Sequence, residues 1–238
     1  MTRPVLEVCA SSPEDVRVAA EAGADRVELC LHWECGGLTP PEADVRAAVA
    51  VGIPVHVLVR PRAGHFCYAP AEWEAMRAQA LGALAAGARR VVIGGLDAAG
   101  GPDLAAMAAL AAACGPDRWV WHRALDAAAD VHAAWTAAAT LPSRRLLSSG
   151  GAPDAWSGRP GIAALVAAGW DVVVGSGVRP EHVPHWASAG VEAVHASCRR
   201  RIPSTLRGFD GTTHPVDPEQ VAAFRRALDQ LPTPSNPS

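Results

Sequence analysis

The stretch Ala22-Gly23-Ala24-Asp25-Arg26-Val27-Glu28-Leu29, "AGADRVEL", joins an Ala-rich amphipathic segment to a short apolar run. Glycine is the preferred residue just past a helix end, because it reaches positive φ without strain. The apolar run that follows is typical of a parallel strand with both faces covered. The stretch therefore predicts a helix, a glycine cap and a parallel strand, in that order.

The same pattern recurs along the chain. The further copies are "VGIPVHVL" from residue 51, "AGARRVVI" from residue 86, "AGWDVVV" from residue 168 and "AGVEAVH" from residue 189. Together with three other apolar runs they predict eight strands, near 5–9, 26–30, 54–60, 90–94, 118–122, 144–148, 171–175 and 192–196. Eight evenly spaced units favour an α/β fold, the (β/α)8 TIM barrel. A doubly wound open sheet is the alternative.

The domain organisation follows from this count. Residues 1–231 are expected to form a single barrel domain whose last helix covers 217–231. The Pro/Ser-rich tail at 232–238 is expected to be disordered, because it has nothing apolar to bury.

Composition excludes several classes of function. Of 238 residues, 50% are hydrophobic and 19% are charged, which is typical of an ordered globular protein. The net charge, 21 − 24 = −3, argues against a nucleic-acid or anionic membrane partner. With no long apolar run and no signal peptide, we expect a cytoplasmic protein whose six cysteines are thiols. Because the sequence contains no lysine, Schiff-base chemistry is excluded.

Polar residues gather at the predicted carboxyl ends of the strands, where barrel enzymes carry their active sites. These residues are Glu7, Cys9, Glu28, Cys30, Arg60, His122, Arg123, Asp126, Ser149, Gly150, Gly175, Gly177 and His195. Since side chains alternate along a strand, Glu7 shares a face with Cys9, and Glu28 with Cys30. We expect the two carboxylates to lie in one layer of the barrel and the two thiols in the next.

Two further motifs predict chemistry. A strand-end His122 beside Arg123 and Asp126 offers acid/base capacity, an anion contact and an orienting carboxylate. The loops "SSGG" at 148–151 and "GSG" at 175–177 are rich in backbone N–H groups, so they are candidate anion-binding turns. Tight-turn chemistry alone also explains these glycines.

Structural explanations compete with these functional ones. Buried Glu–Arg networks also occur inside barrels, so Arg60 or Arg123 could neutralise Glu7 and Glu28. Core packing is the expected role of Cys67 and Cys114, and a hydrogen-bonded core position is expected for His56. No role is assigned to His32, Glu34, Cys35 and His65, which fall in loops.

The motifs together resemble the copper homeostasis family CutC. They are "LEVC" at 6–9, "RVELC" at 26–30, "GGLTP" at 36–40, "RPR" at 60–62, "HRALD" at 122–126, "SSGG" at 148–151 and "HAS" at 195–197. The resemblance covers about residues 4–200 and implies a cytosolic TIM barrel. It also implies Cu(I) ligands at Cys9 and Cys30, and thiolates suit this soft ion.

The chain departs from the family pattern at two places. His65 stands where the family usually has an acid, and Ala193 stands where it commonly has a glutamate two residues before the strand-8 histidine. Glu192 lies one residue away, and alternation would turn it elsewhere.

Two hypotheses remain open. The first is Cu(I) binding by Cys9 and Cys30. The second is a lyase, isomerase or hydrolase acting on a small sugar or anionic metabolite. Its candidate residues are Glu7, Glu28, Arg60, His122, Arg123, Asp126 and His195, with Ser149, Gly150, Gly175 and Gly177 binding the anion. Apolar barrel helices are also compatible with a homodimer.

Overall fold

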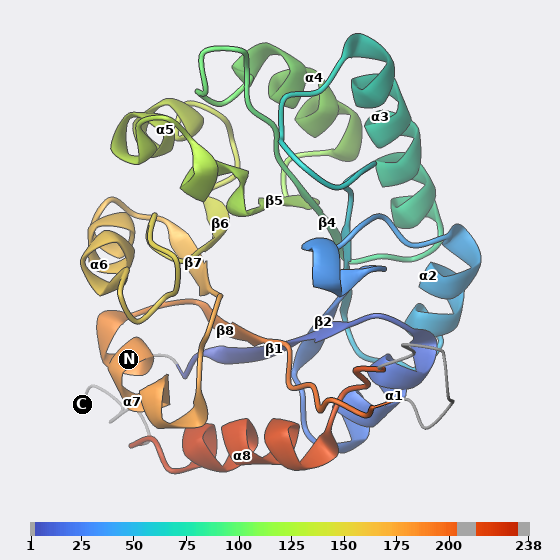
Figure 1. Cartoon of the computed structure of the whole chain (residues 1–238), viewed down its shortest axis with the longest axis vertical. Helices are drawn as coiled ribbons and strands as arrows, with labels where there is room; N and C mark the ends of the chain where they lie inside the picture. Colours follow the sequence, from blue (N-terminus) through green and yellow to red (C-terminus); the bar gives the residue numbers. More distant parts are fainter. Residues whose placement is uncertain (1–2, 204–212, 233–238) are drawn as a thin grey trace, which may run out of the picture.

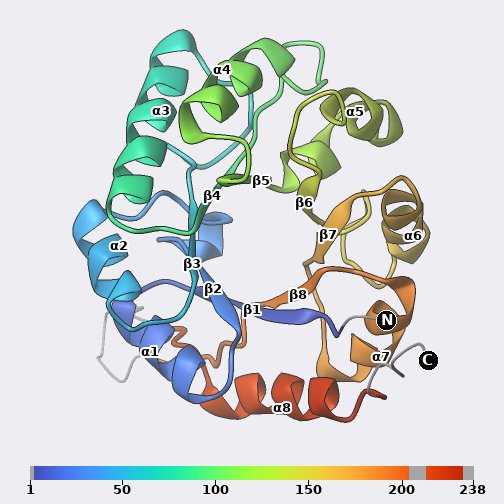
Figure 2. The same ribbon diagram turned by 180° about the vertical axis from the view of Figure 1, so that it is seen from behind.

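The computed structural model describes residues 3–203 and 213–232. Its eight parallel strands close into a barrel in chain order, with helices around the outside (Figure 1, Figure 2). The strands are β1 Val5–Ala10, β2 Arg26–Leu29, β3 Val55–Leu58, β4 Arg90–Ile93, β5 Trp119–Trp121, β6 Arg145–Ser148, β7 Asp171–Val174 and β8 Ala193–Ala196. The predicted TIM barrel is therefore confirmed, and the open sheet is excluded by the β1–β8 pairing.

The helices lie between the strands, as the repeat predicts. They are α1 Pro13–Glu21, α2 Glu42–Val49, α3 Pro70–Ala85, α4 Leu104–Cys114, α5 Val131–Ala138, α6 Arg159–Ala167, α7 Val183–Ala189 and α8 Pro218–Asp229. Short 3-10 turns are η1 Trp33–Cys35, η2 Arg123–Ala127 and η3 Pro180–His182. The glycine of the opening stretch, Gly23, has φ +99°, a conformation that only glycine adopts without strain.

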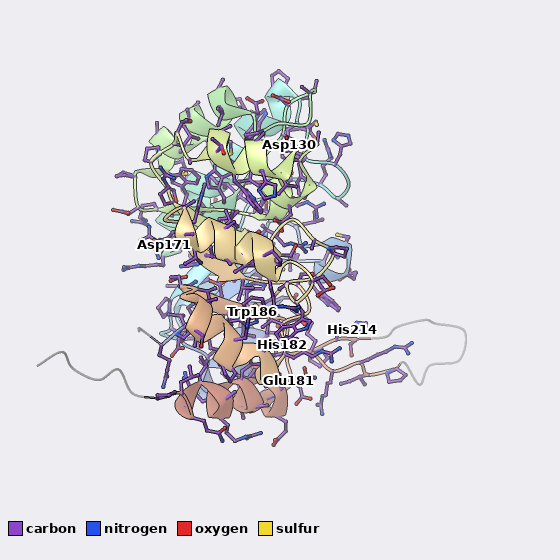
Figure 3. All side chains as sticks on the ribbon, turned by 90° about the vertical axis from the view of Figure 1, so that its left-hand side faces the viewer. Asp130, Asp171, Glu181, His182, Trp186 and His214 are labelled. Atoms are coloured by element: carbon purple, nitrogen blue, oxygen red, sulfur yellow. The ribbon has the colours of Figure 1, made fainter. Side chains whose placement is uncertain are left out.

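The apolar core fills the space between the strands and the helices. Trp119, Trp121 and Trp186 are fully buried there, and Cys114 packs in the same core, as expected. The same expectation is wrong for Cys67, which is only partly buried and lies outside this core. The side view of Figure 3 labels Trp186 on α7. Burial of such large side chains is the main force that holds the helices on the barrel.

The last helix is capped by Asp217, whose side chain accepts the Glu219 N–H. Most of the predicted tail, residues 233–238, lies outside the described residues. After β8, antiparallel bridges join Arg199 to Val216 and Ile202 to Thr213. These segments extend away from the barrel, with His214 labelled on one of them (Figure 3). None of the described helices is long and apolar enough to cross a membrane.

The strand register corrects one prediction. Cys9 lies opposite Glu28, and Glu7 lies opposite Arg26, so the two carboxylates do not share a layer, and neither do the two thiols. The reason is the stagger of strands in a closed barrel, where each interior layer is drawn from alternate strands. Neighbouring β1 and β2 therefore place their interior side chains at offset levels.

Candidate functional site

A cavity of about 460 Å³ opens at the carboxyl ends of the strands. The loop that carries η1 reaches over the barrel mouth and forms part of its wall (Figure 1). The predicted site residues in the lining are Cys9, Glu28, Cys30, Arg60, His122, Arg123, Gly175, Gly177 and His195. This volume is within the range of small-molecule sites, so the cavity can hold much more than one ion.

The two strand-end thiols meet at one wall of the cavity. The Sγ atoms of Cys9 and Cys30 are 3.7 Å apart, and both side chains are buried. The hydrogen bond from Cys30, with help from His195, lowers the pKa of Cys9 well below its usual value although burial opposes this. The same hydrogen bond, together with burial, raises the pKa of Cys30. These shifts favour ionisation of Cys9 before Cys30, with the Cys30 thiol as the hydrogen-bond donor.

Glu7 lies deeper in the barrel and organises an ionic network. Its carboxylate is 2.5 Å from Arg26 Nε, 3.1 Å from His56 Nδ1 and 2.8 Å from His195 Nδ1. Burial alone would raise the pKa of Glu7, but Arg26 and the two imidazoles hold it well below the usual value. Glu7 therefore remains ionised, and its contact with His195 orients that ring toward the cavity.

The partner of Glu7 is the residue that sequence reasoning missed. The structural alternative named Arg60 or Arg123 as its partner, but Arg26 neutralises it, and Arg26 also binds Glu192 at 2.7 Å. The available signal was the alternation of strand β2, which puts Arg26 on the same face as Glu28. The hydrogen-bonded core position expected for His56 is confirmed. Glu192 does not line the cavity.

Cys9, Glu28 and His195 form a second cluster just above this network. One ligand atom from each lies within 4.8 Å of the others, and Glu28 Oε2 is 3.9 Å from His195 Nε2. Burial raises the pKa of Glu28 to about 8, so its carboxyl group is mostly protonated at neutral pH. Burial lowers the pKa of His195, but hydrogen bonds to Cys9 and Glu7 raise it overall to well above the usual value. The surroundings thus favour the thiolate of Cys9, the imidazolium of His195 and the neutral acid of Glu28 in one cluster.

His122 enters the cavity as a neutral ring. Its Nδ1 accepts a hydrogen bond from the Ala124 N–H at 3.0 Å, which leaves the proton on Nε2. Burial, together with the charge of Arg60, lowers the pKa of His122 to about 3. Within the described part of the chain, Nε2 has no hydrogen-bond partner. His122 is therefore a hydrogen-bond donor at neutral pH and is not set up as a proton acceptor.

Arg123 and Asp126 are held by the "SSGG" turn. Arg123 Nε is 3.0 Å from Asp126 Oδ2, and its Nη2 donates to Ser149 Oγ at 2.9 Å. Asp126 also accepts the backbone N–H groups of Ser149 and Gly151. The N–H of Gly150 donates to Ser148 Oγ. The donors of this turn are therefore taken by the protein's own groups, with Asp126 as the main acceptor.

The other predicted anion turn lies on the cavity. Gly175 and Gly177 are part of the lining, although the Gly175 N–H is bonded to the carbonyl of Ser148 at 3.0 Å. Asp126, Ser149 and Gly150 lie behind the wall and do not line the cavity. Anion binding by these turns stays a prediction.

The residues without an assigned role lie away from the cavity lining. His32 and Glu34 contact each other at 3.2 Å on the surface, and Cys35 is exposed beside them. His65 is exposed, and its carbonyl accepts a hydrogen bond from Arg62. Trp33 and Phe66, which were not predicted, do line the cavity, because their loops fold back over the barrel mouth.

Comparison with known proteins places these features in a family. The sequence profile of the CutC family matches residues 4–200. A CutC family protein from Klebsiella pneumoniae subsp. pneumoniae is 40% identical over 94% of this chain and 93% of its own. The chain belongs to the CutC family. Another such protein, from Citrobacter koseri, is also 40% identical, over 94% of this chain and 92% of its own.

Solved structures give the same result. The crystal structure of a proposed copper homeostasis protein CutC from Streptococcus agalactiae matches with a TM-score of 0.73 and 27% identity. The match covers 82% of this chain and 98% of that one. Phosphoribosyl anthranilate isomerase from Thermus thermophilus matches with a TM-score of 0.56 and 15% identity, over 94% of this chain and 98% of that one. This second likeness shows the barrel fold alone.

Proposed function

We propose that this protein acts in copper homeostasis in the cytoplasm and binds Cu(I) as its cargo through Cys9 and Cys30. The observation that carries the proposal is the buried thiol pair, with Sγ atoms 3.7 Å apart, in the wall of an open cavity. Cu(I) is a soft ion that prefers thiolate ligands, and the lowered pKa of Cys9 provides one thiolate before the ion arrives. The copper homeostasis role named for the Streptococcus agalactiae relative supports the same function.

The test is a Cu(I) competition titration under anaerobic, reducing conditions. We expect one tightly bound Cu(I) in the wild type and loss of this binding in the Cys9→Ser/Cys30→Ser variant. Cys35→Ser is the matched control, because it removes an exposed thiol that does not line the cavity. Affinity that is unchanged in the double variant would refute the proposal.

A second candidate is an enzyme, and one arrangement favours it. Glu7 orients His195, which contacts the Cys9 thiolate, and the neutral acid Glu28 lies beside them. A carboxylate, an imidazole and a thiol in this order are typical of nucleophilic and acid/base catalysis. We therefore retain a lyase, isomerase or hydrolase acting on a small sugar or anionic metabolite.

The enzyme proposal is tested on metal-free protein with panels of sugars, sugar phosphates and organic acids. Turnover that is lost in Glu28→Gln and in His195→Asn would support it. The Cys35→Ser variant again serves as the control. Absence of turnover across all the panels would count against the second candidate and leave the first unaffected.

A further inference from the structure

Arg60 is a buried cation that no described carboxylate neutralises. Arg60 has only 5% exposure, and no acid of residues 3–203 or 213–232 forms an ion pair with it. Nη1 donates to the carbonyl oxygens of Cys35 and Gly37 at 2.9 and 3.0 Å, and Nη2 donates to that of Gly64 at 2.9 Å. These carbonyl groups hold the guanidinium, but no negative charge of the described residues balances it, so its place in a cavity wall favours an anionic ligand.

Two hydrogen-bond donors in the same wall also lack partners. They are Arg60 Nε and His122 Nε2, both buried and both without an acceptor in the described part of the chain. Both side chains contact one ring: the guanidinium carbon of Arg60 and the centre of the His122 ring are each 5.1 Å from the centre of the Phe66 ring. Other buried donors of the described residues also lack partners, among them several tryptophan N–H groups of the core. Of these unpartnered nitrogen donors, those of Arg60 and His122 are the ones that belong to cavity-lining residues.

We propose that the wall formed by Arg60, Phe66 and His122 binds the carboxylate of a small organic acid with an apolar or aromatic body. One uncompensated positive charge and two N–H donors match one negative charge and two oxygens. A phosphate group carries more charge and three terminal oxygens, so these groups would satisfy it less well. The inference stands whether or not Cu(I) binds, and for the second candidate function it names the substrate class.

The rest of the cavity accounts for the body of the ligand. Beyond the polar groups, its lining includes Trp33, Leu58, Leu147 and Val178, which are apolar or aromatic. The volume of about 460 Å³ is far larger than a bare carboxylate needs. An apolar body therefore gains from burial against this surface, while the acid group meets Arg60 and His122.

The thiol pair occupies a different part of the wall. Cys9 lies in β1 and Cys30 directly follows β2, whereas Arg60 follows β3 and His122 follows β5. The carboxylate subsite uses the tautomer of His122 set by the Ala124 N–H and the permanent charge of Arg60. It therefore needs no group of the thiol cluster.

The experiment is calorimetric titration of metal-free protein with four probes: acetate, phenylacetate, phenylacetamide and inorganic phosphate. We expect phenylacetate to bind more tightly than acetate, because of its apolar body. Phenylacetamide has nearly the same shape but no charge, so it should bind at least about tenfold more weakly. Phosphate should bind more weakly than phenylacetate.

Variants assign the subsite to its residues. His122→Asn keeps an acceptor for the Ala124 N–H and removes the second nitrogen, so it should weaken phenylacetate about tenfold. Arg60→Gln should abolish binding, and Arg89→Gln, an exposed arginine at the opposite end of the barrel, is the control. If Arg60→Gln fails to fold, His122→Asn and the phenylacetamide comparison decide the question.

Three results would overturn the inference. They are equal binding of phenylacetate and phenylacetamide, no binding of either carboxylate, and tighter binding of phosphate than of phenylacetate. Because no copper is present, none of these outcomes depends on the Cu(I) titration, so the two proposals fail separately.

Discussion

Replacement of Arg26 should show how much the interior ionic network contributes to the free energy of unfolding. The Arg26 side chain has 8% exposure and the Glu7 side chain 3%, and their charged groups are 2.5 Å apart. At an effective dielectric constant of about 20, this distance corresponds to an attraction of roughly 6 to 7 kcal/mol before desolvation is counted. Arg26→Met leaves Glu7 buried with only two imidazoles as partners. We therefore expect a loss of about 3 kcal/mol in the free energy of unfolding, at the low end for a broken buried pair.

The assay is urea unfolding of the single and double variants. Glu7→Gln/Arg26→Met leaves no isolated charge from this pair, so it should lose less stability than the sum of its two single variants. Arg46→Met is the control, because it breaks an exposed pair with Glu42 and should leave the midpoint nearly unchanged. A cost below about 1 kcal/mol for Arg26→Met, or additive single variants, would refute the reasoning.

The same pair predicts a pH dependence with a definite sign. Because the folded protein holds the pKa of Glu7 below its usual value, the carboxylate stabilises the fold above about pH 4. This contribution is lost as the pH falls through the lowered pKa. Arg26→Met raises the pKa of Glu7, so the variant should unfold at a higher pH than the wild type during acid titration.

Three further predictions concern the cavity. Burial raises the folded-state pKa of Glu28 to about 8, so its contribution to stability is present in acid and lost as the pH rises toward that value. Glu28→Gln should therefore raise the urea midpoint relative to wild type at about pH 9 and change it little at about pH 4. Equal gains at both pH values would contradict this pKa shift. The rate of Cys9 alkylation by iodoacetamide, followed by peptide mass spectrometry, should fall less steeply with decreasing pH than that of free N-acetylcysteine, because the pKa of Cys9 is lowered. Parallel pH profiles would show that Cys9 is an ordinary thiol. Gly37 has φ +84°, and an added Cβ would lie 2.5 Å from Leu58 Cδ2 and 3.2 Å from Cys30 Sγ. Gly37→Ala should therefore cost about 1 to 3 kcal/mol of stability and weaken Cu(I) binding. The control is Gly52→Ala, which has a similar φ and no neighbouring atom within 4 Å, and it should cost stability alone.

The sequence by itself determined the barrel, the family motifs and the residues at the strand ends. A glycine after an Ala-rich segment followed by an apolar run is a local pattern, and its regular recurrence identified the helices and strands. Because carboxyl ends of parallel strands meet at one end of a barrel, the sequence also placed Glu28, His122 and His195 at one site. All three line the cavity.

Only the tertiary structure decided which of these groups touch. Barrel closure sets the stagger of the strands. This stagger places Cys9 opposite Glu28 and allows Glu7 to form an ion pair with Arg26. Backbone carbonyl groups of loops that fold back over the barrel mouth accept hydrogen bonds from Arg60. The carboxylate of Asp126 accepts hydrogen bonds from the "SSGG" turn. Such contacts join residues far apart in the chain, so local periodicity cannot reveal them. Residue types and faces follow from the strand period, whereas partners, burial and pKa shifts follow from the register that closure imposes.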